Sequence, residues 1–423
     1  MRVLWLTPIQ LPAAKGTAST SGGWLEGLRS ALERYEPRVE LVIASWGNVA
    51  HEPFEQGNAE YWSIRNTEKP GRATDLLRRW RHEVIPEGAV EDCMGIIAAS
   101  APDVVHVHGS ESFLGLALRG IQAPAVVSLQ GMAAAYTAHW FAGLAVGDVA
   151  RALADPAFLH GYGLYHDYRR DSARADCELQ ILESCDHFLG RTEWDRTVLR
   201  CFRPGAQYHY VGEVLDPAFR TASWDPESAG DGVIYCTSGS RPIKGLAALL
   251  DAVALLREIT DQTLRVRIAG AVRSGPVWPL IRRRLDDRRL KGVVELLGTL
   301  GPSEVARELE AASLFVHPSH MDNSPNALCE AMLVGAPCVA AYVGGVPSLV
   351  RHEETGLLYH DRDPFMLAGA MDRLLRDREL ATRLGRAARR EALVRHDAES
   401  IAHAVVRVYE DVIAERSSDA RTS

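Results

Sequence analysis

Paired cysteines are missing from this chain. Its seven cysteines are odd in number, widely scattered and never spaced as C-x-x-C. Such a set excludes a disulfide framework and a structural zinc site as the source of stability. We therefore expect reduced thiols and no structural metal.

An excess of positive charge is also missing. The 423 residues include 47 Lys and Arg against 55 Asp and Glu, which gives a formal net charge of −8. Proteins whose main task is to bind nucleic acid are normally basic, so we expect no nucleic-acid partner. A hydrophobic content of 47% with 24% charged residues is ordinary for a globular chain, which excludes a disordered one.

Apolar runs that could cross a membrane are scarce. No charged side chain occurs between Arg119 and Asp148, a stretch long enough to span a bilayer. Gln130 and His139 interrupt it, and it begins like a buried strand, so a strand followed by an uncharged loop and helix is favoured. The run before Pro8 is too short for a signal peptide. We predict a cytoplasmic protein, with peripheral contact at the inner membrane face as an alternative.

Strands and helices alternate along the chain. In the first half, strands are expected at residues 3–6, 39–44, 103–107, 125–129, 186–190 and 208–211. In the second half, they are expected at 233–236, 264–269, 293–296, 313–316 and 337–341, with helices at 245–258, 276–290, 302–312 and 325–334. Strands separated by helix-length intervals indicate parallel sheets covered on both faces.

Two domains account for this pattern. A stretch rich in Pro, Ser, Gly and Asp at 216–231 is typical of a linker, whereas 51–86 is irregular and is interpreted as an insertion. We predict an α/β fold of two doubly wound, Rossmann-like domains, 1–215 and 232–395, that face each other across a cleft. A final helix at about 399–416 is predicted to pack back on the first domain. In such sheets ligands bind outside the C-terminal ends of the strands, so those ends hold the candidate sites.

The most informative strand end is at residues 316–330. A polar loop follows the strand and leads into a helix, with Ser324 as the expected N-cap and Pro325 as the first helical residue. Asp322 lies just before this helix, and Glu330 lies about one and a half turns inside it. Both carboxylates are candidates to face a ligand beside helix N–H groups that attract phosphate. The alternative is structural, with Asp322 as a capping acid and Glu330 as a solvated helix residue.

A second strand end carries two cations. Arg241 and Lys244 stand where a diphosphate would need positive charge, Arg as a bidentate fork and Lys as a point charge. The segment is not a P-loop, because Gly245 follows the lysine. After the first strand, Gly22 and Gly23 allow the backbone to approach an anion closely. No G-x-G-x-x-G motif follows that strand, which argues against a dinucleotide-dependent dehydrogenase.

Together these segments resemble the retaining glycosyltransferases of family 4, which have the GT-B fold. The likeness spans nearly the whole chain, and its motifs occur in the family's order at 103–109, 297–301, 317–319, 330–332 and 344–347. Asp322-x7-Glu330 matches the family's paired carboxylates, with Asp in place of the usual first Glu. The resemblance makes the first domain the acceptor side and the second the nucleotide-sugar donor side.

The resemblance also implies roles for single residues. Glu330 would hold the ribose hydroxyls of a nucleotide sugar, and Asp322 would contact the sugar ring. Lys244 would neutralise the donor diphosphate, and Arg241 would supply, from a shifted position, the charge of the family's usual arginine. Further donor contacts are implied for Gly22, Gly23, Leu297, Gly298, Thr299, Ser324 and Asn326.

Two residues are candidates for the acceptor or sugar side. Where the family often has His, this chain has Gln130, which can hydrogen-bond a sugar hydroxyl but cannot act as a base. His139 is a candidate to handle a proton, with a structural histidine as the alternative. Asp361 and Asp363 resemble a metal-binding pair, but their position suits a turn, and no metal is expected there.

The predicted function is retaining hexosyl transfer from a UDP- or GDP-sugar, without metal or cofactor. The resemblance implies front-face attack, in which the diphosphate helps to remove the acceptor proton. The acceptor is unidentified: a saccharide, a lipid-linked compound or a small molecule, as in the synthesis of surface polysaccharide, glycolipid or small glycosides. Two alternatives stay open, namely an epimerase or phosphorylase of the same fold, and a non-catalytic protein that binds nucleotide sugars.

Overall fold

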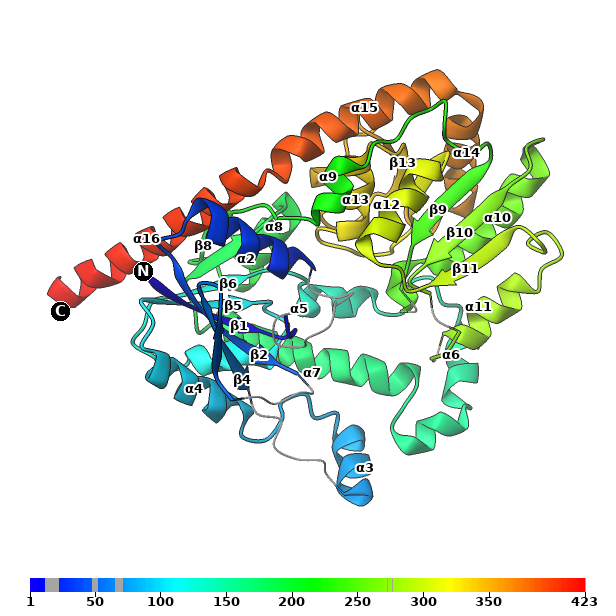
Figure 1. Ribbon diagram of the computed structural model, residues 1–423. Helices are drawn as coiled ribbons and strands as arrows, with labels where there is room; N and C mark the ends of the chain where they lie inside the picture. Colours follow the sequence, from blue (N-terminus) through cyan, green and yellow to red (C-terminus); the bar gives the residue numbers. More distant parts are fainter. Residues whose placement is uncertain are drawn as a thin grey trace. The chain divides into compact units, whose positions relative to one another are not determined.

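The protein is described by a computed structural model that covers residues 1–11, 23–47, 52–64, 71–239, 241–271, 273–275 and 277–422. The chain forms two compact units (Figure 1). Unit 1 comprises residues 1–137, 166–214 and 396–423, and unit 2 comprises residues 138–165 and 215–395. Residues 138–165 thus cluster with the second unit, although we predicted them inside a first domain that ends at 215.

An eight-stranded sheet forms the centre of unit 1. Its order is β3-β4-β2-β1-β5-β6-β7-β8, and every neighbouring pair is parallel except β3 with β4. The strands are β1 (Arg2–Thr7), β2 (Glu40–Trp46), β3 (Phe54–Gln56), β4 (Ala59–Ile64), β5 (Val104–His108), β6 (Ala125–Ser128), β7 (His187–Gly190) and β8 (Gln207–Tyr210). β3 and β4 extend the sheet within the segment that we interpreted as an irregular insertion, so that interpretation was wrong for residues 54–64.

Apolar side chains cover both faces of this sheet, because successive residues of a strand point to opposite sides. On one face, Trp5 packs with α2 (Gly23–Tyr35) and α16 (Ala398–Thr422). On the other face, Leu6 packs with α4 (Ala89–Ser100). The remaining helical segments of this part of the chain are α3 (Arg72–Arg81), η1 (Phe113–Leu118), α5 (Ala133–Tyr136), α7 (Leu164–Leu182) and α8 (Glu193–Phe202).

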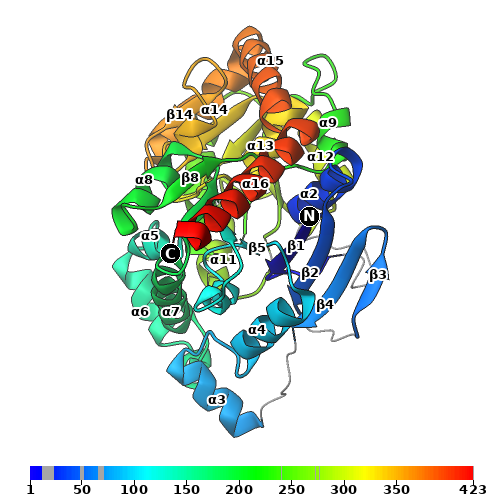
Figure 2. The same cartoon turned by 90° about the vertical axis from the view of Figure 1, so that its left-hand side faces the viewer.

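The C-terminal helix α16 contributes to the core of unit 1. It lies beside α2 and against β5 and β6 (Figure 2). Tyr409 of this helix is fully buried, and its hydroxyl lies 2.6 Å from His106 Nδ1. The same oxygen accepts a hydrogen bond from Trp5 Nε1 at 3.2 Å. One side chain of the last helix therefore ties two central strands together.

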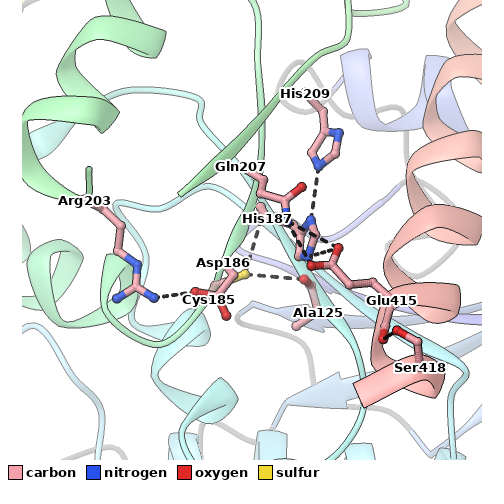
Figure 3. A network of polar contacts seen from close by, with 9 residues as sticks. All are labelled: Ala125, Cys185, Asp186, His187, Arg203, Gln207, His209, Glu415 and Ser418. Atoms are coloured by element: carbon pink, nitrogen blue, oxygen red, sulfur yellow. Dashed lines mark hydrogen bonds and ion pairs between the residues drawn. The ribbon is translucent and has the colours of Figure 1, made fainter. Parts of the chain in front are cut away.

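The end of α16 is held by polar contacts (Figure 3). Glu415 points toward β7 and β8, where it accepts a hydrogen bond from Gln207 Nε2 at 3.0 Å and lies 3.4 Å from His187 Nε2. His187 Nδ1 in turn lies 3.2 Å from His209 Nε2. Because Glu415 is about half exposed, this network fixes the helix end more than it adds stability.

A six-stranded, fully parallel sheet forms the centre of unit 2. Its order is β11-β10-β9-β12-β13-β14. The strands are β9 (Val233–Thr237), β10 (Arg265–Ala269), β11 (Val294–Gly298), β12 (Leu314–His317), β13 (Cys338–Ala341) and β14 (Leu357–Tyr359). The helical segments are η2 (Thr137–His139), α6 (Val146–Leu153), η3 (Pro156–His160), α9 (Pro217–Thr221), η4 (Pro242–Lys244), α10 (Leu246–Ile259), α11 (Trp278–Leu285), α12 (Pro302–Ala311), α13 (Asn326–Val334), η5 (Val346–Ser348), α14 (Pro364–Arg376) and α15 (Arg378–Arg395).

Two further expectations need correction in unit 2. The stretch 216–231 is not a free linker, because Phe219 of α9 is 2% exposed and α9 packs on α12 and α13. Pro325, and not Ser324, is the N-cap of α13, and no side-chain bond caps this helix. The seven cysteines, in contrast, are free thiols, and all but Cys201 are buried.

Residues 138–165 dock on α11 and on the loop after β12. Asp148 is 2.5 Å from Arg283 and is almost buried. A Cβ atom added to Gly143 would lie 2.2 Å from His320 Nε2. Only glycine, which has no Cβ atom, therefore allows the backbone at this position to lie so close to the His320 ring. Packing and charge together hold this segment in unit 2.

Candidate functional site

Two predicted site residues meet in unit 2. β9 and β12 are neighbours in the parallel sheet, so the loops that follow them leave the same edge side by side. Lys244 comes from the loop after β9 and Asp322 from the loop after β12. Lys244 Nζ donates a hydrogen bond to Asp322 Oδ2 at 2.7 Å. The two strand ends that we singled out in the sequence therefore form one site.

Glycines allow these loops to approach each other. Gly245 has a φ of +69°, and a Cβ atom there would lie 1.8 Å from the carbonyl oxygen of Pro318. Gly344 has a φ of +48°, and its Cβ atom would lie 2.1 Å from the carbonyl oxygen of Asp322. Only glycine fits both the backbone conformation and the space. The pair Lys244–Asp322 thus rests on close backbone packing from two sides.

Asp322 is held as a carboxylate although it is only 7% exposed. Burial alone would raise its pKa, but the charge of Lys244 and the contact with His317, whose Nε2 is 3.4 Å away, outweigh burial and leave the pKa below its ordinary value. Lys244 keeps about a third of its side chain exposed. The site therefore presents a fixed anion beside a cation that solvent or a ligand can reach.

His320 stabilises the loop that carries Asp322. Its backbone N–H donates to the carbonyl oxygen of Ile243 at 2.7 Å, and its Nδ1 lies 2.5 Å from Asp361 Oδ1. Asp363 accepts hydrogen bonds from backbone N–H groups at the start of α14. Both acids of the Asp361–Asp363 pair thus have structural contacts. Among the described residues, no group of three or more His, Cys, Asp or Glu side chains is arranged to hold a metal ion.

Glu330 lies in the second turn of α13 and is partly exposed. Its charge acts on Tyr235 of β9: burial is the main cause of the raised pKa of that phenol, and Glu330 adds to it. Glu330 is therefore close enough to the buried phenol of Tyr235 to act on it electrostatically. Ser324 and Asn326 flank the start of the same helix and are partly exposed.

The other predicted donor-side residues occupy separate positions. Leu297 and Gly298 end the edge strand β11, and Thr299 is exposed beyond it. Arg241 is exposed and lines a small hollow whose other lining residues are apolar or glycine, among them Val277 and Trp278. The lining of this hollow contains neither Lys244 nor Asp322.

In unit 1, Gly23 is the first residue of α2, and a Cβ atom there would meet open space. Gly22 lies outside the described residues. Gln130 follows β6 and is partly buried, whereas His139 is exposed and belongs to unit 2. The two residues that we grouped on the acceptor or sugar side thus belong to different units.

Sequence reasoning missed a group of buried polar residues at the strand ends of unit 1. Arg191, directly after β7, forms an ion pair of 2.7 Å with Glu213, and both side chains are at most 9% exposed. The guanidinium also lies 5.4 Å from the centre of the Trp24 ring. His108 at the end of β5 is fully buried beside them. The signal available in the sequence was the position of Arg191 directly after the strand expected at 186–190.

Comparison with known proteins identifies the family to which this chain belongs. The profile of the family "Glycosyl transferases group 1" matches residues 221–391, which lie within unit 2. A D-inositol 3-phosphate glycosyltransferase from Frankia alni is 30% identical over 302 residues, which cover 67% of this chain and 68% of that protein. The chain belongs to the group 1 family of glycosyltransferases. The residues matched by the profile include Lys244, Asp322 and Glu330.

Other members of this glycosyltransferase family are similar over shorter stretches. A D-inositol 3-phosphate glycosyltransferase from Corynebacterium efficiens is 34% identical over 254 residues, 54% of this chain and 57% of that protein. The chain therefore matches little more than half the length of that relative. The N-acetyl-alpha-D-glucosaminyl L-malate synthase of Bacillus anthracis is 26% identical over 44% of this chain and 47% of that protein.

Solved structures show that this glycosyltransferase has the GT-B fold. Sucrose-phosphate synthase from Thermosynechococcus elongatus aligns with a TM-score of 0.74 at 19% identity, covering 98% of this chain and all of that one. HepE from Anabaena in complex with UDP-glucose aligns with a TM-score of 0.65 at 16% identity, covering 97% and 100%. In the described part of the chain, no helix has both the length and the apolar character that a bilayer crossing requires.

Proposed function

We propose that this protein transfers a hexosyl group from a UDP-sugar to a hydroxyl group of a small polar acceptor, with retention of anomeric configuration. The observation that carries the proposal is the contact of 2.7 Å between Lys244 Nζ and Asp322 Oδ2, within the unit that matches the family. It supports a donor site because a cation and a carboxylate stand together at adjacent strand ends, where doubly wound sheets bind their ligands.

The proposed chemistry requires stabilisation of the leaving group. When the bond between sugar and diphosphate breaks, negative charge develops on the departing diphosphate. A preorganised donor aimed at such charge is typically worth about 3–4 kcal/mol of barrier. We infer that Lys244 exchanges Asp322 for the diphosphate when the donor binds, and that Asp322 then accepts a hydrogen bond from the sugar. With Lys244 in this role, the proposed reaction uses neither metal nor cofactor.

Other donor contacts are part of the same proposal. Glu330 would accept hydrogen bonds from the ribose hydroxyls, because it lies one helix turn beyond the loop that holds Asp322. Gly22 and Gly23 would offer backbone amides, and Arg241 would add a second cation. Base and sugar contacts are proposed for Leu297, Gly298, Thr299, Ser324 and Asn326.

Relatives guide the choice of substrates. A UDP-sugar is proposed as donor because HepE, which shares the fold, was solved with UDP-glucose. A small polar acceptor is proposed because the relatives are named for D-inositol 3-phosphate and L-malate. We also propose that the protein acts in the cytoplasm.

The test measures UDP release from UDP-glucose with D-inositol 3-phosphate, L-malate and simple sugars as acceptors. We expect Lys244→Ala to slow turnover by about 100-fold or more, because it removes the charge that stabilises the leaving group. Lys291→Ala is the matched control, since Lys291 is an exposed lysine of the same unit. Glu330→Ala should raise the Michaelis constant for the donor, with exposed Glu258→Ala as its control.

Three outcomes would contradict the proposal. Near-normal rates in both Lys244→Ala and Glu330→Ala would refute the site. Binding of UDP-glucose with no UDP release for any acceptor would favour a non-catalytic binding protein. Conversion of the donor without an acceptor would favour an epimerase.

A further inference from the structure

The helix α3 buries none of its ten residues. Both ribbon views show it at an outer end of unit 1, away from the strands of the central sheet (Figure 1 and Figure 2). Its C-terminal end contacts α7 at one histidine: His82 Nε2, directly after α3, lies 3.0 Å from His166 Nδ1, and the ring of Trp80 meets that of His166 edge-on at 4.8 Å. Burial in the core of unit 1 therefore does not account for the large apolar side chains of this helix.

The apolar side chains of α3 share one face of the helix. At 3.6 residues per turn they fall within an arc of about 100° around the helix axis. These residues are Ala73, Leu76, Leu77 and Trp80. An amphipathic helix presents a stripe of this width to the apolar surface on which it packs. In α3 the stripe is open to solvent, because Leu77 is 49% exposed and Trp80 is 40% exposed.

Arginines border this apolar face on both sides. Arg72 and Arg79 lie next to one edge of the arc, and Arg81 lies next to the other. Arg78, the fourth arginine, lies on the opposite side of the helix and pairs with Glu87 at 2.8 Å. The helix thus has four arginines against one acid, whereas the whole chain has a net charge of −8. A cationic and apolar surface on an acidic protein fits a partner that is anionic at its surface and apolar beneath it.

Acidic neighbours do not prevent the bordering arginines from meeting an anionic partner. Arg79 contacts Asp75 at 2.5 Å, and Arg81 lies 3.8 Å from Glu83. Both acids are at least 39% exposed, and exposed ion pairs of this kind are weak, so they open when a stronger anionic field is offered. The side chain of Arg81 is itself 65% exposed. The charge that borders the apolar face is therefore available to a partner.

We propose that α3 is an interfacial helix through which the protein binds reversibly to an anionic lipid bilayer. Leu77 and Trp80 enter the boundary between headgroups and acyl chains, and Arg72 and Arg81 contact lipid phosphates. Ten helical residues span only about 15 Å, so the apolar face is small and charge supplies much of the affinity. Binding therefore needs anionic lipid and weakens as the salt concentration rises. The inference goes beyond the proposed function and does not depend on it, because no residue of α3 belongs to the donor site.

The test is cosedimentation of the full chain with vesicles of phosphatidylcholine and phosphatidylglycerol in equal amounts, and with vesicles of phosphatidylcholine alone. We expect binding to the mixed vesicles only, and its loss at high salt. The double variant Arg72→Gln, Arg81→Gln should weaken this binding by about tenfold or more, because both charges next to the apolar face are removed. Leu77→Ala should weaken it by about threefold or more, because less apolar surface leaves water. The three side chains are exposed, so these variants should fold like the wild type.

The helix α8 of the same unit provides matched controls. Arg196 and Arg200 are exposed arginines of α8, and its Phe202 is 43% exposed. Arg196→Gln combined with Arg200→Gln, and separately Phe202→Ala, should leave vesicle binding unchanged. Equal losses in the α3 and α8 variants, or equal binding to vesicles without phosphatidylglycerol, would overturn the proposal. A loss in the α3 arginine variant with none in Leu77→Ala would also overturn it, because the partner would then be a polyanion and not a bilayer.

A polarity-sensitive dye reports which surface of the protein meets the lipid. Cys201 of α8 is the one exposed cysteine among the described residues, so Leu77→Cys in a Cys201→Ser chain carries the dye on α3. Its emission should shift to shorter wavelength when the mixed vesicles are added. The same dye on Cys201 of the wild type should keep its emission. Cosedimentation without a shift at position 77 would show that another surface binds the vesicles, and would refute the role of α3.

Discussion

Replacing Glu178 by Gln should change how the stability of unit 1 depends on pH. Glu178 of α7 is fully buried; its Oε1 accepts a hydrogen bond from Ser110 Oγ at 2.5 Å and its Oε2 accepts one from the Ala134 N–H at 2.7 Å. Burial is the main cause that raises the pKa of Glu178 from 4.5 to about 7, with a further contribution from the charge of Glu111. The pKa of Glu111 is also raised by burial to about 7.

The direction of the change in stability with pH follows from the difference in proton binding between the folded and unfolded states. A carboxyl group with a raised pKa holds its proton in the folded state after the unfolded chain has released it. Folding stability from Glu178 is therefore fully present below pH 4.5 and is lost as the pH rises through 7. The loss is about 3 kcal/mol, because each tenfold change in proton affinity is worth about 1.4 kcal/mol.

The Glu178→Gln variant isolates the contribution of the Glu178 carboxyl group to the pH dependence of stability. A glutamine side chain imitates the protonated acid: its amide oxygen can accept from the Ala134 N–H, and its NH₂ group can donate to the hydroxyl of Ser110, which rotates freely. We expect wild type and Glu178→Gln to differ by less than about 1 kcal/mol at pH 5, and the variant to be more stable by up to about 3 kcal/mol at pH 8. Buried neutral histidines also respond to pH, but they are common to both proteins and cancel in the difference.

Hydrogen exchange of peptides from α7 and β5 measures the free energy of opening in unit 1 alone, which suits a chain of two units. The measurements are made at pH 5 and pH 8 and corrected for the intrinsic exchange rate at each pH. Exposed Glu183→Gln, just beyond the end of α7, is the control. The reasoning is refuted if wild type and Glu178→Gln lose the same free energy between the two pH values.

Two further predictions concern packing. Tyr409→Phe removes the hydroxyl that His106 and Trp5 share, and should lower the free energy of unfolding by about 1–3 kcal/mol without changing UDP affinity. Chemical denaturation and UDP titration measure the two quantities. Unchanged stability would contradict the prediction. Gly245→Ala places a methyl group against the carbonyl oxygen of Pro318 at a left-handed backbone position, so it should weaken UDP binding and lower the melting temperature. The control is Gly292→Ala: Gly292 is also left-handed but has open space around it, so this variant should leave UDP binding intact.

Much of the fold followed from local patterns in the sequence. Central strands such as β2 and β9 were predicted because they contain continuous apolar runs, as expected for strands buried on both faces. The strands β3, β4 and β14 were missed: β3 and β14 are edge strands of only three residues, and in β4 the polar residues Glu60 and Ser63 interrupt any apolar run. The placement of residues 138–165 was missed because it depends on the packing of Asp148 and Gly143 against distant parts of unit 2.

The same distinction between local pattern and tertiary packing applies to the residues of the candidate sites. That Lys244 and Asp322 come together was predictable, since both follow parallel strands and such loops share one edge of the sheet. The pairing of Arg191 with Glu213, and the burial of His108 beside this pair, were not predictable. They depend on the order in which four strands lie side by side, and on which faces of those strands are covered.

The C-terminal helix bears on how the protein is made. During synthesis, the strands of unit 1 and all of unit 2 leave the ribosome before α16 supplies Tyr409 and the cover for β5 and β6. Unit 2 has every residue it needs at that stage, whereas unit 1 still exposes an uncovered sheet face. We expect unit 2 to fold first in the nascent polypeptide, and a chaperone to be needed most for unit 1, whose beginning is translated earliest.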